Sequence, residues 1–73
     1  MILTFATTHL AISAEEALLA RGFPLEVVPV PEWIRAGCGL AIRIPVGAEE
    51  AALAALTAAG IPWQGLHGHR PSR

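Results

Sequence analysis

Lysine is absent from this chain of 73 residues, and cysteine occurs only once, at Cys38. The net charge is −1 and the arginines are scattered, whereas nucleic-acid-binding modules gather basic residues into a patch, so we expect no nucleic-acid partner. A single cysteine can form neither an internal disulfide nor a metal site built from cysteine pairs. We therefore expect no bound metal and no cofactor.

Long apolar runs are also missing. No run reaches the roughly 18 residues that a membrane-spanning helix requires, and the N-terminus lacks the basic region of a signal peptide. We expect a protein without a membrane association, located in the cytoplasm.

Apolar side chains are abundant, because 53% of the residues are hydrophobic and only 15% are charged. A chain of this length buries only roughly 60% of the surface that its unfolded form exposes. Part of the apolar surface should remain exposed, which favours a homo-oligomer or a protein partner.

Periodicity predicts a chain of alternating strands and helices. Strands are expected at 2–6, 25–30, 40–44 and from residue 61 to a fading end at Leu66, and helices at 9–21 and 48–59. The clearest strand alternates, with Leu40, Ile42 and Ile44 facing inward and Ala41 and Arg43 facing outward.

Two halves of the same βαβ order follow one another, and each helix stops at a glycine, Gly22 and Gly60. Such halves build an α+β ferredoxin-like βαββαβ sandwich, with a four-stranded antiparallel sheet in the order 4-1-3-2 and two helices on one face. We expect one domain over residues 1–66 and a loose tail over 67–73.

Cys38 stands between Gly37 and Gly39, so its neighbours place no side chain beside it. This placement is suited to a thiol that meets another molecule. It is equally compatible with a small buried residue in a glycine turn, which is a common role of free cysteine.

The expected strand order brings the start of the third strand, with Cys38, to the end of the first strand. There Thr7 or Thr8 would cap the first helix, whose positive N-terminal end stabilises a thiolate. His9 could shuttle a proton and Arg35 could add positive charge. Trp63 should lie at the same end and His67 and His69 at the opposite end, where two histidines fall short of a metal site.

Several short motifs agree in order and spacing with one family: Thr4-Phe5, Thr7-Thr8-His9, Ala14-Glu15, Pro29-Val30-Pro31 and Cys38-Gly39-Leu40-Ala41. With these motifs the chain, up to about Trp63, resembles the selenium/sulfur carrier-like proteins. The resemblance implies that Cys38 carries sulfur or selenium between a donor and an acceptor protein. Many relatives have a hydroxyl residue before the Cys-Gly pair, whereas Ala36-Gly37 stands here.

Two hypotheses follow, and neither requires a free-standing enzyme. In the first, Cys38 accepts a persulfide or selenosulfide, supported by Thr7, Thr8, His9, Arg35, Gly37 and Gly39. In the second, the chain is an ACT-like or ferredoxin-like binding or oligomerisation module in which Cys38 is incidental. The reactivity of the Cys38 thiol distinguishes them.

Overall fold

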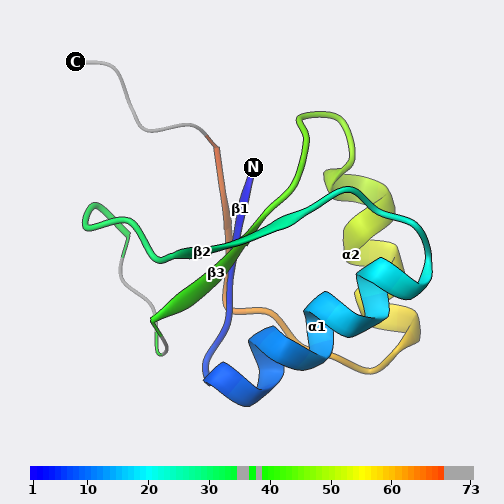
Figure 1. The fold of residues 1–73 in the computed structure, drawn as a ribbon, viewed down its shortest axis with the longest axis horizontal. Coiled ribbons are helices and arrows are strands. Elements are labelled where there is room, and N and C mark those ends of the chain that lie inside the picture. The colour runs from blue at the N-terminus through cyan, green and yellow to red at the C-terminus, as the bar shows by residue number, and fades with distance from the viewer. Residues whose placement is uncertain (35–36, 38, 69–73) are drawn as a thin grey trace.

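The computed structural model describes residues 1–34, 37 and 39–68 and confirms the expected βαββαβ order. The elements are β1 (Ile2–Thr4), α1 (Thr8–Ala20), β2 (Glu26–Pro29), β3 (Leu40–Arg43), α2 (Glu49–Ala58) and β4 (Gly65–His67). The sheet order is β2-β3-β1-β4, which read from the other edge is 4-1-3-2, and each neighbouring pair is antiparallel. Figure 1 shows both helices together on one side of the sheet.

One face of the sheet forms the main core with the two helices. Leu3 of β1 pairs with Ile42 of β3, and both side chains are fully buried. They pack against small and branched residues of α1 and α2: Ala11, Ala14, Leu18, Ala52, Ala55 and Leu56. The predicted inward direction of Ile42 and Ile44 is confirmed, and the partly buried Leu40 packs against the same cluster. Alanines on the helix faces allow this close approach, since they add little bulk between backbone and sheet.

The opposite face is not left open. Ala41 lies on this face, as its alternation with Ile42 predicts, but it is fully buried rather than exposed. It forms a second cluster with Ile2 and with Ile34, which belongs to the connection between β2 and β3. The connection therefore folds back over the sheet and covers apolar surface on this face.

Helix α1 begins where its capping residue predicts. The Thr7 hydroxyl accepts a hydrogen bond from the Leu10 N–H at 3.1 Å, so Thr7, one of the two predicted caps, is the N-cap. The helix ends before Gly22, whose φ of +80° favours glycine, and the Phe23 N–H donates to the Leu18 carbonyl oxygen.

The last strand differs from the prediction. Residues 61–63 form no strand, and pairing begins only after the Gln64 N–H donates to the Thr4 carbonyl oxygen at 2.7 Å. The expectation that pairing fades at Leu66 is wrong, because His67 pairs with Ile2. Ladder hydrogen bonds use only the backbone, so a polar residue is tolerated on this edge strand.

Within the described part of the chain, neither helix is long and apolar enough to cross a membrane.

Candidate functional site

Two backbone donors at the N-terminus of α1 remain unpaired within the described part of the chain. The Leu10 N–H is taken by the Thr7 hydroxyl, and the Ala11 N–H donates to the Thr7 carbonyl oxygen at 3.2 Å. The N–H groups of Thr8 and His9 have no hydrogen-bond partner among the described residues. No acidic side chain stands in the first turn, so the partial positive charge of the helix end is not neutralised from within the helix.

Gly37 lies directly against the turn that leads into this helix. A Cβ atom at position 37 would be 2.5 Å from the carbonyl oxygen of Ala6 and 3.1 Å from its carbonyl carbon. No side chain fits at that distance without displacing backbone. Because Ala6 immediately precedes the N-cap Thr7, the absence of a side chain at Gly37 lets the β2–β3 connection reach the start of α1.

A side chain from the approach to β4 holds Gly37 in this place. The Gly37 N–H donates to Oε1 of Gln64 at 2.8 Å. The Gln64 backbone is itself attached to the end of β1, through its N–H and the Thr4 carbonyl oxygen. Three segments far apart in the sequence therefore meet at Gly37.

The chain on the other side of position 38 is also held. The carbonyl oxygen of Gly39 accepts a hydrogen bond from the Val30 N–H at 3.0 Å, and β3 begins at the next residue, Leu40. A Cβ atom at position 39 would meet nothing within 4 Å, in contrast to position 37. Cys38 and Arg35 themselves lie outside the described residues.

The structure thus brings some of the predicted site residues together and leaves others apart. Gly37 and Thr7, the N-cap of α1, lie at the same end of the sheet, and Thr8 is the first residue of α1. His9 is exposed, and its side chain has no hydrogen bond or ion pair with another described residue. Trp63 precedes Gln64 at this end, but it is half-buried and packs against the main core.

His67 reaches further toward this end than its backbone position indicates. Its backbone pairs with Ile2, at the far end of β1, as expected. Its ring, however, lies over Gly65, where a Cβ atom would be 2.9 Å from Nε2. The same ring meets the Trp33 ring edge-on, with the two ring centroids 6.3 Å apart. His69 lies outside the described residues, and the described ones contain no group of three or more His, Cys, Asp or Glu that could hold a metal ion.

Gln64 and the Trp33–His67 contact were not found from the sequence. Gln64 follows a proline and a tryptophan in a stretch without periodicity, and a lone glutamine carries no motif. The only indirect signal was Gly37, whose lack of a side chain is consistent with a close approach of two backbones.

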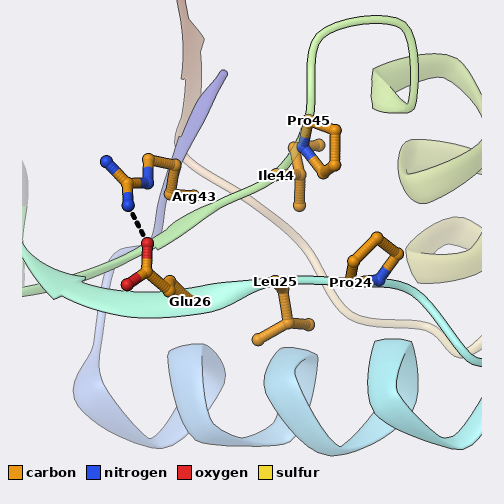
Figure 2. A pocket seen from close by; sticks show the side chains of 6 residues that line it. All are labelled: Pro24, Leu25, Glu26, Arg43, Ile44 and Pro45. Atoms are coloured by element: carbon orange, nitrogen blue, oxygen red, sulfur yellow. Dashed lines mark hydrogen bonds and ion pairs between the residues drawn. The ribbon is translucent and has the colours of Figure 1, made fainter.

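A shallow cavity of about 330 Å³ lies away from Gly37, at the opposite end of the β2–β3 pair. Figure 2 shows its lining, which comes from residues 24–26 and 43–45, with an exposed ion pair between Glu26 and Arg43 at one side. Pro29 pairs with Leu40 at the other end of the same strands, so this cavity does not adjoin Gly39.

Comparison with known proteins gives one family. Residues 1–68 match the model of the family described as "Putative Se/S carrier protein-like". No curated protein and no solved structure matches the chain.

Proposed function

The chain belongs to the Se/S carrier protein-like family, and we propose that it carries sulfur or selenium on Cys38 between a donor and an acceptor protein. The observation that supports this proposal is the contact of Gly37, the neighbour of Cys38 in sequence, with the turn before α1.

Through this contact, the residue before Cys38 lies beside a helix end that favours negative charge. The N–H groups of Thr8 and His9, which have no partner among the described residues, and the partial positive charge of α1 stabilise a thiolate, which is the reactive form of cysteine. We assign Thr7 the role of capping this helix end. We assign His9 and Arg35 the role of supplying positive charge, with His9 also exchanging protons with solvent because it is exposed.

The proposed transfer needs no oxidant. The Cys38 thiolate attacks the outer sulfur of a persulfide on the donor, the donor's S–S bond breaks, and a new S–S bond forms on Cys38. The proton of the donor persulfide stays on the transferred sulfur, so Cys38 becomes a persulfide, and the donor's inner sulfur leaves as a thiolate that takes up a proton from solvent. The reverse exchange delivers the sulfur to an acceptor thiol, and selenium takes the place of the outer sulfur in a selenosulfide.

Intact-mass spectrometry tests this proposal. Wild-type protein is incubated with a small-molecule persulfide at neutral pH, with Cys38→Ser as the matched blank. We expect the wild type to gain the mass of one sulfur atom, to lose it on reduction, and the blank to gain nothing. Labelling of Cys38 by iodoacetamide only after denaturation would contradict the proposal, because a buried thiol cannot meet a donor protein.

The proposal also includes a location and an assembly. A reducing compartment such as the cytoplasm keeps a single thiol free of disulfides. Large apolar side chains remain exposed on α1, β2 and the turn before α2, namely Ile12, Leu19, Val27 and Val46. We propose that exposed apolar side chains such as these support self-association or docking of a donor or acceptor protein.

A further inference from the structure

Gln64 is bound at both its backbone and its side chain to the two segments that frame the proposed site. Its N–H donates to the Thr4 carbonyl oxygen at 2.7 Å, and its Oε1 accepts from the Gly37 N–H at 2.8 Å. The first bond joins Gln64 to the end of β1, an inner strand of the sheet, and the second holds the residue just before Cys38. Gln64 therefore links the segment that contains Cys38 to the sheet.

The residues after Gln64 hold an earlier part of the same connection. The His67 ring lies over Gly65 and meets the Trp33 ring edge-on, and the adjacent Ile34 is buried against Ala41 and Ile2. Residues 33–34 are thus fixed to the sheet independently of Gly37. Among the described residues, the next attachment along the chain is the hydrogen bond from Gly37 to Gln64, and the bond from Val30 to Gly39 secures the chain beyond position 38.

The bond between Gly37 and Gln64 is exposed, so it contributes little to holding the whole fold together. Its effect is local, because it selects one position of an exposed segment among those that the flanking glycine allows. A group that orients a nucleophile in this way changes its rate of reaction more than it changes the stability of the protein.

We propose that Gln64 is a positioning residue for sulfur transfer at Cys38, through the backbone of Gly37. This inference rests on the proposed carrier function. It adds a residue whose role acts through Gly37 and requires no contact with the transferred sulfur.

Two variants separate the hydrogen bond from other properties of Gln64. Gln64→Met has a similar length and no acceptor oxygen at the end of the side chain, whereas Gln64→Glu keeps an acceptor and adds a negative charge. Thr57→Ala is the control, because it removes an exposed side-chain hydrogen bond, to the Leu53 carbonyl oxygen, from helix α2.

For Gln64→Met we expect the Gly37 amide to exchange with solvent about 2- to 10-fold faster, which is the range that loss of one ordinary hydrogen bond implies. We expect persulfide loading of Cys38 to slow by a similar factor, with only the small fall in melting temperature that loss of one exposed hydrogen bond implies. Gln64→Glu should restore the protection of Gly37 and raise the pH midpoint of Cys38 alkylation, since a nearby negative charge disfavours the thiolate. Thr57→Ala should change neither rate.

The outcomes distinguish this inference from the function on which it rests. If the wild type takes up sulfur and Gln64→Met takes it up at the same rate, the positioning role is refuted and the carrier function stands. If the wild type takes up no sulfur, the carrier function is refuted, and unchanged exchange of the Gly37 amide in Gln64→Met would refute the attachment itself.

Discussion

Replacing Gly37 by alanine tests the contact that places the cysteine-bearing segment. The new Cβ atom would lie 2.5 Å from the Ala6 carbonyl oxygen. The backbone at Ala6 must therefore shift, or the segment around Gly37 must leave its position. Gly39→Ala is the matched control, because a Cβ atom there meets nothing within 4 Å.

Comparing these two variants separates the steric cost of a side chain at position 37 from the effect that any glycine-to-alanine substitution has on the unfolded chain. Each gains about 0.4–1 kcal/mol from the lower entropy of its unfolded chain, and this gain cancels in the difference between them. If the segment stays in place, overpacking costs Gly37→Ala about 1–3 kcal/mol. If the segment moves away, it loses the hydrogen bond to Gln64, which costs about 0.5–1.5 kcal/mol.

We therefore expect Gly37→Ala to be less stable than Gly39→Ala by about 0.5–3 kcal/mol, the span of these two costs. Urea denaturation followed by tryptophan fluorescence measures the two free energies of unfolding under identical conditions. Equal stabilities would refute the reasoning, because they would mean that Gly37 does not pack against Ala6 in solution.

Three further predictions concern the residues around this contact. Thr7→Ala should destabilise α1 by about 0.5–2 kcal/mol in urea denaturation by loss of the N-cap bond, while Thr8→Ala should have a smaller effect; equal losses would argue against Thr7 as the cap. Ile34→Ala should cost about 2–5 kcal/mol in the same assay and raise the binding of a hydrophobic dye, because it uncovers Ala41; a loss below 1 kcal/mol, well under that range, would mean that the connection does not cover the sheet. Sedimentation at micromolar concentration should give a mass above that of the monomer, and a sharp monomer would count against self-association through the exposed apolar side chains.

Periodicity predicted the fold well because each core face repeats regularly. The alternation of Ile42 with Ala41 and the small-residue faces of the two helices determine which side of the sheet the helices cover. The βα order with short glycine-stopped helices then leaves few ways to arrange four strands. The element order and the antiparallel sheet could therefore be derived before any coordinates were known.

The details of the site depend on contacts that no periodic pattern records. Whether Ile34 turns back onto the sheet, and whether the Gln64 side chain reaches Gly37, is decided by how an irregular connection folds against distant residues. The expected end of β4 at Leu66 is wrong because strand pairing depends on the backbone and not on the polarity of the His67 side chain. Topology alone did predict that the start of the third strand lies near the end of β1, and Gly37 is found there.

The most direct test of the carrier function is whether sulfur bound to Cys38 can be passed on. Wild-type protein is loaded with isotopically labelled sulfur, freed of excess donor, and mixed with an acceptor thiol of distinct mass, with Cys38→Ser treated in parallel. We predict that the label leaves the wild type and appears on the acceptor in equal amount, while the variant neither binds nor transfers label. Label that never binds to folded wild type, or that binds and is not passed to the acceptor, would contradict a carrier role for Cys38.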